Sequence, residues 1–312
     1  MMARQCFVAL VLPVLLALGI PSGPSRAAAT DWVGNAHAAA RLITAVEATG
    51  SSTRLDAGLQ IRLAPGWHTY WRTPGDAGVP PTIDWEGSRN IAAATIAWPA
   101  PRRLPAIGGL ETQGYEDGVV LPIAVTLSRT GEAVSLHAEV DYAACSQVCI
   151  PYHASLDLAL PPGLAVPGTE APLIAAASRQ VPRSFADTGL QLDAVVAGGG
   201  AKPVLSVRLT SSGAPFRAPD LFIEGAKGAS PGRPEVTLAD AGRIATLRIP
   251  FHGAAASALV GVPLWLTVVD GDRAAAISAV PHLGALPSLG AGAPPLAMIG
   301  VALLGGLILN LM

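Results

Sequence analysis

Residues 54–63 read RLDAGLQIRL, in which apolar side chains occupy every second position. Because successive side chains of a β-strand point to opposite faces, this alternation predicts a strand with one face in a core. The alternation returns at 134–140, and apolar runs at 119–127 and 156–160 are also typical of strands. Turn-forming Pro and Gly residues separate these runs. The first half of the chain is therefore predicted to fold as an antiparallel β-sandwich.

The composition agrees with an all-β fold and excludes other classes. The 312 residues include 34 Gly and 28 Pro without a collagen-like period, which suits many short strands better than long helices. Hydrophobic residues make up 51%, so the chain is not a disordered polyelectrolyte. Lys and Arg number 20 against 22 Asp and Glu, which leaves no basic field for nucleic acid and excludes it as a partner.

Both ends of the chain carry membrane-targeting patterns. Residues 1–29 read as an export signal, with Arg4 before an apolar stretch and small residues before Thr30. Residues 296–312 are apolar and uncharged, and are slightly short of the roughly 20 residues that cross a bilayer. We expect them to begin a membrane helix that is truncated at Met312. Export would place the rest of the chain where disulfides persist.

The strand pattern divides the chain into two β-sandwich domains. It stops at the Pro-Pro-Gly of 161–163, and strand-like runs resume near residue 190. The second half holds no cysteine, so redox chemistry is expected in the first. The predicted segments are a signal at 1–29, a first domain at 30–163, a linker with a short helix at 164–183, a second domain at 184–284, a linker at 285–295 and a membrane helix at 296–312.

The chemical centre is the segment from Cys145 to Cys149, with three residues between the two thiols. A pair this close, after a strand and before a proline turn, favours an exchangeable disulfide. A permanent staple is the alternative, although a short loop removes little entropy from the unfolded chain. A second alternative is a copper(I) or zinc site, for which Cys145, Cys149 and His153 would be ligands.

Several motifs together resemble a known family. They are GWHTYWR at 66–72, PGDAG at 74–78, WPAP at 98–101, VLPI at 120–123 and the segment 142–151 around the two cysteines. This set is similar to the periplasmic N-terminal domain of the DsbD family of thiol:disulfide interchange proteins, in its ScsB-like branch. The closing run at 299–312 looks like the start of that family's first membrane helix.

The resemblance implies a function. It implies an immunoglobulin-like domain, without a cofactor, on the periplasmic face of the bacterial inner membrane. As part of a protein-disulfide reductase, the domain would take electrons from one thioredoxin-like protein and pass them to others. Those acceptors are disulfide isomerases, cytochrome c maturation proteins or a partner related to copper tolerance. Cys149 would form the mixed disulfide with the partner, and Cys145 would resolve it. A non-enzymatic copper-binding or adaptor module remains the alternative.

The resemblance also assigns supporting residues. His68, Tyr70 and Tyr115 match positions near the redox pair, where they could stabilise a leaving thiolate, although core aromatic residues would give the same pattern. Arg72 and Asp76 would orient a partner or form a surface pair. The family shields its disulfide with an aromatic-tipped loop, and in this sequence Leu104 or Ile107 would have to take that place. The cysteines are also closer together here than in better-known members of the family.

Overall fold

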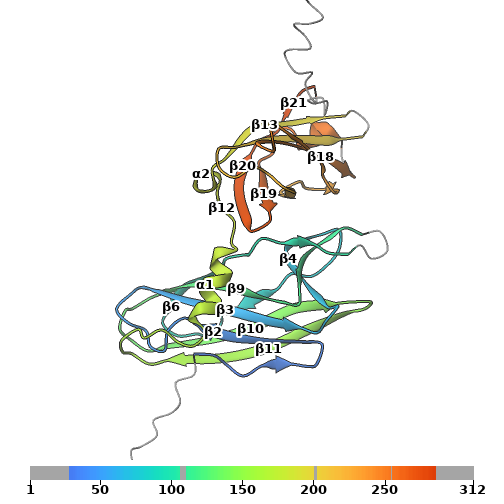
Figure 1. Cartoon of the computed structure of the whole chain (residues 1–312). Helices are drawn as coiled ribbons and strands as arrows, with labels where there is room; N and C mark the ends of the chain where they lie inside the picture. The colour runs from blue at the N-terminus through green and yellow to red at the C-terminus, as the bar shows by residue number, and fades with distance from the viewer. Residues whose placement is uncertain (1–27, 106–109, 200–201, 254, 286–312) are drawn as a thin grey trace, which may run out of the picture.

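The computed structural model describes residues 28–105, 110–199, 202–253 and 255–285 (Figure 1). Strands contain 55% of the residues and helices 7%, which confirms the predicted all-β class. The strands build two immunoglobulin-like β-sandwiches. No helix in these ranges is long and apolar enough to span a bilayer. The predicted membrane helix at 296–312, and the predicted signal up to residue 27, lie outside the described residues.

The first β-sandwich contains two antiparallel sheets. The first sheet has the order β1 (Val33–Gly34), β2 (Ala38–Thr44), β3 (Arg54–Leu63), β9 (Gly118–Leu127) and β6 (Ile91–Ile96). The second has the order β11 (Cys149–Leu160), β10 (Val134–Cys145), β4 (His68–Gly75), β8 (Thr112–Glu116) and β7 (Arg102–Arg103), with β5 (Thr82–Asp84) also paired to β10.

Alternating side chains build the core of this sandwich. In β3, Leu55 and Ile61 are buried, whereas Arg54 and Arg62 are exposed, in agreement with the pattern in the sequence. Trp71 of β4 is fully buried and reaches the same core from the opposite sheet. Burial of a large aromatic side chain is among the strongest contributions that a single residue makes to a core.

The long hairpin of β10 and β11 positions the two cysteines. Its register runs from the pair Val134 and Leu160 to the pair Cys145 and Cys149 without a shift. A one-residue slip would turn every buried side chain of a strand to the solvent, so the alternation fixes this register. The buried side chains of the hairpin include Leu136, Ala138, Val140, Leu156 and Leu158. The two cysteines therefore form the last pair of an uninterrupted ladder.

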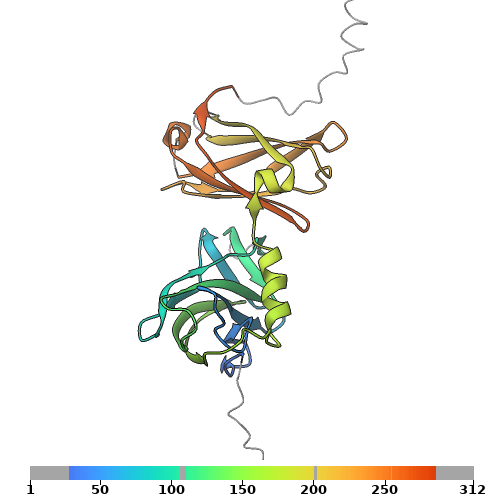
Figure 2. The ribbon, with the colours of Figure 1, turned by 90° about the vertical axis from the view of Figure 1, so that its left-hand side faces the viewer.

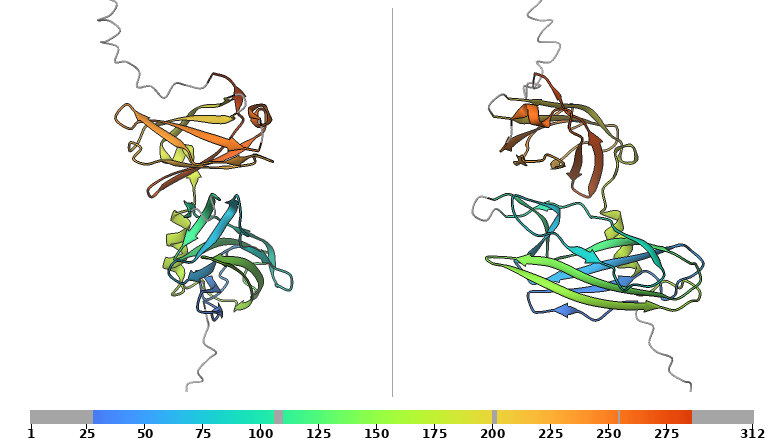
Figure 3. Two further views of the ribbon diagram at one scale, coloured as in Figure 1. Left: turned by 90° about the vertical axis from the view of Figure 1, so that its right-hand side faces the viewer. Right: turned by 180° about the vertical axis from the view of Figure 1, so that it is seen from behind.

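A short helix follows the first sandwich. Helix α1 (Ala171–Arg179) lies within the predicted linker and packs on β3 and β9 through Ile174 and Ala177. Figures 2 and 3 show it along one side of the first sandwich, before the chain enters the second. Just before the helix, Glu170 forms an ion pair with Arg41 of β2 at 3.0 Å. The linker is thus fixed against the first sandwich by packing and by charge.

The second β-sandwich also contains two sheets. One has the order β12 (Arg183–Ser184), β20 (Arg273–Ala279), β19 (Leu264–Asp270) and β15 (Asp220–Glu224). The other has the order β16 (Ser230–Pro231), β18 (Ile244–His252), β14 (Val204–Ser211), β13 (Leu190–Gly198) and β21 (His282–Leu283), with β17 (Glu235–Ala239) paired to β18. Helix α2 (Phe185–Thr188) and a 3-10 helix (Ala256–Leu259) complete it. It has its own apolar core, and β15 faces the first sandwich.

Candidate functional site

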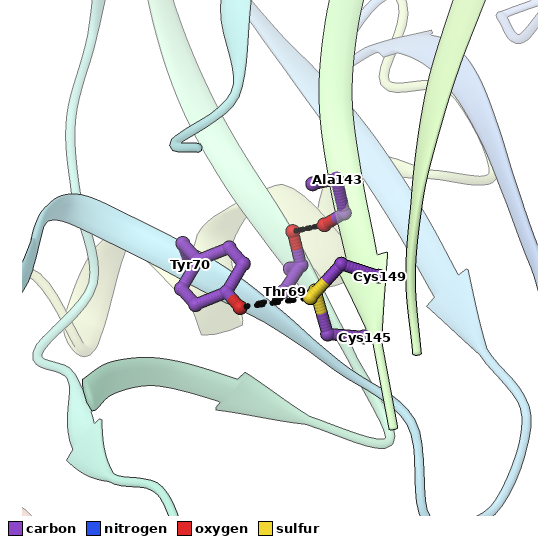
Figure 4. The surroundings of a disulfide bond; sticks show 5 residues. All are labelled: Thr69, Tyr70, Ala143, Cys145 and Cys149. Atoms are coloured by element: carbon purple, nitrogen blue, oxygen red, sulfur yellow. Dashed lines mark hydrogen bonds between the residues drawn. A yellow bond between two sulfur atoms is a disulfide. The ribbon is translucent and has the colours of Figure 1, made fainter. Parts of the chain in front are cut away.

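Cys145 and Cys149 form a disulfide at the end of the long hairpin (Figure 4). Cys145 is the last residue of β10 and is 1% exposed, whereas Cys149 begins β11 and is exposed. Three residues join them, and the amide of Ser146 donates a hydrogen bond to the carbonyl of Val148 at 3.0 Å. The two cysteines therefore differ in exposure: Cys149 is an exposed residue and Cys145 is a buried one.

The buried sulfur is covered by Tyr70 of β4. The Tyr70 hydroxyl lies 3.0 Å from Cys145 Sγ, to which it donates, and 3.6 Å from Cys149 Sγ (Figure 4). Tyr70, Leu104, Ala143 and Cys145 form a small buried apolar cluster of their own. A hydroxyl that already points at a sulfur can stabilise the thiolate that forms there when the disulfide opens.

Two neighbours hold Tyr70 in this position. The Thr69 hydroxyl donates to the carbonyl of Ala143 at 2.8 Å, which fixes β4 against β10 (Figure 4). Gly78 lies against the Tyr70 ring with a φ of +132°, and a Cβ at this position would come within 2.4 Å of ring carbons. Position 78 therefore needs glycine both for its backbone conformation and for the space that the ring occupies.

Burial sets the protonation state of the groups beside the disulfide. It raises the pKa of the Tyr70 hydroxyl, which therefore remains a donor throughout the neutral range. Burial also lowers the pKa of His68, against the opposing charge of Glu116, so its imidazole is neutral. The His68 ring meets the Tyr70 ring edge to face at 5.5 Å. Among the described residues, His68 makes no hydrogen bond to a sulfur. It meets the site through its ring contact with Tyr70 and through its backbone, which is the ladder partner of Cys145.

Tyr115, the third predicted support, lies in the main core instead. Its hydroxyl donates to the carbonyl of Pro99 at 2.8 Å, and 7% of the residue is exposed. Burial raises its pKa well above the ordinary value. The structure therefore favours the core alternative for Tyr115, and Tyr70 is the phenol at the sulfurs.

The four residues expected to bind a partner or to shield the disulfide do not form one group among the described residues. They are Arg72, Asp76, Leu104 and Ile107. Arg72 donates to Glu224 of the second sandwich, and Asp76 accepts from the backbone amide of Glu111 at 2.9 Å, so they form no pair with each other. Leu104 is 1% exposed and packs in the buried cluster with Tyr70 and Cys145, so it does not form an exposed shield over Cys149. Ile107 lies outside the described residues.

The proposed metal ligands do not converge. His153 pairs with Asp141 in the hairpin, four residues along β10 from Cys145, which corresponds to about 13 Å of strand. Its ring contacts Asp141 at 2.9 Å and Glu139 at 2.8 Å. Within the described ranges, no group of three or more His, Cys, Asp or Glu side chains has a geometry that could hold a metal ion. The geometry of this disulfide-bonded structure therefore gives no support to the alternative ligand set of Cys145, Cys149 and His153.

The outer face of the hairpin carries a row of charges that the sequence analysis missed. This histidine–carboxylate row consists of Asp157, His137, Glu139, His153 and Asp141, in spatial order. Each imidazole lies between two carboxylates at 2.7–3.0 Å. The alternation of 134–140 already placed His137 and Glu139 on the outer face, but only the register of the hairpin brings His153 beside them.

This row predicts a pH dependence of stability. The hydrogen bond to Asp157 raises the pKa of His137 above the ordinary value of 6.5. The hydrogen bond to Asp141 raises the pKa of His153 in the same way. The stabilisation of the folded state by the two protonated histidines should be complete below about pH 6.5. It should be lost as the pH rises through their raised pKa values. Thermal unfolding between pH 5.5 and 8.5 should therefore show a larger fall of Tm in the wild type than in the His137→Asn, His153→Asn double variant. Parallel curves would contradict this assignment.

A β-sandwich whose hairpin ends in a disulfide between one exposed and one buried cysteine has the fold and site of a thiol-disulfide interchange domain. Residues 39–161 match the family model of the N-terminal domain of the thiol:disulfide interchange protein DsbD. Residues 180–284 match a domain of unknown function, DUF8393.

A solved structure extends the likeness to both sandwiches. The chain is similar to the crystal structure of the N-terminal periplasmic domain of ScsB from Proteus mirabilis, with 27% identity and a TM-score of 0.66. The match covers 83% of this chain and 100% of that one. A search among curated proteins finds no match.

Proposed function

We propose that the chain is a periplasmic electron carrier that exchanges its Cys145–Cys149 disulfide with thioredoxin-like proteins. The observation that carries this proposal is the difference between the sulfurs: Cys149 is exposed, and Cys145 is buried against the Tyr70 hydroxyl. The match of residues 39–161 to the DsbD family model and the likeness to the periplasmic domain of ScsB support both the chemistry and the location. Residues 296–312 would tether the carrier to the inner membrane.

The geometry supports one order of attack during loading. A donor thiolate attacks Cys149 Sγ, because that sulfur is accessible, and the bond to Cys145 breaks. The electron pair of that bond stays on Cys145 as a thiolate, which the Tyr70 hydroxyl stabilises at 3.0 Å. The second thiolate of the donor then attacks the donor sulfur of the mixed disulfide, the bond to Cys149 Sγ breaks, and Cys149 leaves as a thiolate that takes up a proton. The donor becomes a disulfide, and the carrier becomes a dithiol.

Delivery reverses these roles. The Cys149 thiolate attacks a disulfide of the acceptor and forms a mixed disulfide, releasing one acceptor thiolate. Cys145 then attacks Cys149 Sγ, closes the ring again and releases the second thiolate of the acceptor. Two electrons have passed, and no metal or organic cofactor enters the balance. The acceptors would be disulfide isomerases, cytochrome c maturation proteins or a copper-tolerance partner.

A redox titration tests the proposal. The chain is equilibrated in dithiol buffers of graded potential, and free thiols at Cys145 and Cys149 are counted by alkylation and mass spectrometry. We expect a midpoint of roughly −180 to −270 mV, the range of exchanging dithiols. A midpoint below roughly −300 mV would mark a structural disulfide and overturn the proposal.

A further inference from the structure

The two faces of strand β15 pack against different sandwiches. Leu221 and Ile223 point into the core of the second sandwich. Phe222, between them, is 2% exposed and belongs to the core of the first sandwich, where its ring meets Trp71 edge to face at 6.0 Å. Asp220 and Glu224 lie on the same side as Phe222, since alternate residues of a strand share a face. One face of this strand therefore packs against the first sandwich, with the Phe222 side chain in its core.

Glu224 holds the strand that carries Tyr70. Its carboxylate accepts from Arg72 Nε at 2.9 Å, from Arg72 Nη2 at 2.7 Å and from the Thr73 hydroxyl at 2.8 Å. The Glu224 side chain is 15% exposed, so water competes weakly with this two-pronged contact. Arg72 follows Tyr70 by two residues in β4, and its guanidinium lies over the Trp71 ring. The carboxylate thus fixes β4 directly beyond the residue that contacts the sulfurs.

This part of β4 has few other attachments. The ladder between β4 and β8 pairs His68 to Tyr70, is then interrupted, and resumes only at Gly75. A side-chain hydrogen bond from Gln113 to the carbonyl of Thr73, at 2.6 Å, spans the interruption. On the other edge, β4 pairs with β10 at His68 alone. The contacts with Glu224 therefore replace ladder bonds where the sheet leaves β4 unpaired.

Asp220 binds Arg103, the residue next to Leu104 of the buried cluster. Arg103 Nε lies 2.9 Å from Asp220 Oδ2, and Arg103 Nη2 donates to the carbonyl of Leu221 at 3.0 Å. The Arg103 side chain is 12% exposed and lies over the Phe222 ring. Arg103 directly precedes Leu104, which packs in the cluster with Tyr70 and Cys145. The same five-residue strand thus contacts the chain next to both Tyr70 and Leu104, the two larger side chains in the cluster with Cys145.

We infer that residues 220–224 clamp the redox site and that Glu224 and Asp220 are positioning residues for the hydrogen bond from Tyr70 to Cys145. This gives the second sandwich, which matches a domain of unknown function, a task in the chemistry of the first. The inference depends on the proposed function only for what the clamp does in the cell. The effect of the clamp on the reactivity of the disulfide can be measured with a small dithiol and needs no partner protein.

A double-mutant cycle on the full chain tests the clamp. The rate of disulfide reduction by dithiothreitol, and the thiolate pKa of Cys145 in the reduced protein, are measured for Glu224→Ala, Tyr70→Phe and the double variant. We expect Glu224→Ala to slow reduction about three- to tenfold, the loss of one hydrogen bond, and to raise the thiolate pKa. In the Tyr70→Phe background the same change should have almost no further effect, because Glu224 acts through Tyr70.

Two further variants keep the test decisive. Glu132→Ala removes a carboxylate from an exposed surface pair with Arg129 and should leave both quantities unchanged. Glu224→Gln keeps the volume and one acceptor oxygen, and gives the measurement if Glu224→Ala does not fold. Reduction at the wild-type rate, or an effect that simply adds to that of Tyr70→Phe, would overturn the clamp. If the redox midpoint lies below roughly −300 mV but the double-mutant cycle gives the expected coupling between Glu224 and Tyr70, only the proposed function is overturned.

Discussion

Replacing Cys149 by serine should abolish electron transfer to a thioredoxin-like partner while leaving the fold nearly intact. The exposed sulfur is the atom that an incoming thiolate can reach, so its loss removes the covalent intermediate altogether. The stability cost should stay within about 2 kcal/mol, because the disulfide closes a loop of only a few residues. The twelve backbone pairs of the hairpin also hold the two positions together without it.

The measurement combines an insulin or partner-reduction assay with thermal unfolding. Cys145→Ser is the matched control, since it keeps the exposed thiol and should accumulate the mixed disulfide instead of turning over. A Cys149→Ser variant that retains turnover would refute the order of attack. A collapse of Tm in that variant would show that the disulfide is a staple, and the carrier proposal would fail with it.

Removing the Tyr70 hydroxyl should have the second largest effect. Tyr70→Phe keeps the ring against Gly78 and Leu104 but deletes the donor 3.0 Å from Cys145 Sγ. A hydrogen bond to a charged group contributes about 1.5–3 kcal/mol, so reduction should slow by roughly 10- to 100-fold. The thiolate pKa of Cys145 should rise for the same reason. Stopped-flow reduction across pH would report both changes.

Tyr142→Phe is the control for this prediction. Tyr142 is also a buried tyrosine, but its hydroxyl has no hydrogen-bond partner within the described part of the chain, and its ring stacks on Tyr152. Deleting that hydroxyl should leave the reduction rate unchanged. Equal losses in the two variants would mean that ring packing, rather than the contact with sulfur, governs the rate.

Local patterns in the sequence were sufficient for the strands and for the cysteine pair. The alternation at 54–63 and at 134–140 corresponds to β3 and β10 as the structure has them. Because a strand period of two leaves one choice of buried face, these stretches also determine which way their side chains point. The short spacing from Cys145 to Cys149 likewise limited the pair to a local disulfide or a metal site.

Contacts between distant segments could not be read from spacing. Arg72 was expected to orient a partner protein, yet the carboxylate that it binds belongs to Glu224, 152 positions further along the same chain. Tyr70 and Tyr115 both matched positions near the redox pair, and only the placement of β8 sends the Tyr115 hydroxyl to Pro99. His153 looked like a possible ligand because it follows Cys149 closely, but a strand carries it away from the sulfurs at over 3 Å per residue.

The uninterrupted hairpin has a consequence for how partners tell the two redox states apart. Since backbone pairing extends to the cysteines themselves, opening the disulfide needs no rearrangement of the strands that present it. We therefore expect a protein approaching Cys149 to meet nearly the same backbone in both states. The reduced carrier differs by the broken S–S bond and, once a thiol is deprotonated, by a negative charge. We expect discrimination between an empty and a loaded carrier to depend on that charge, and to weaken as salt screens it.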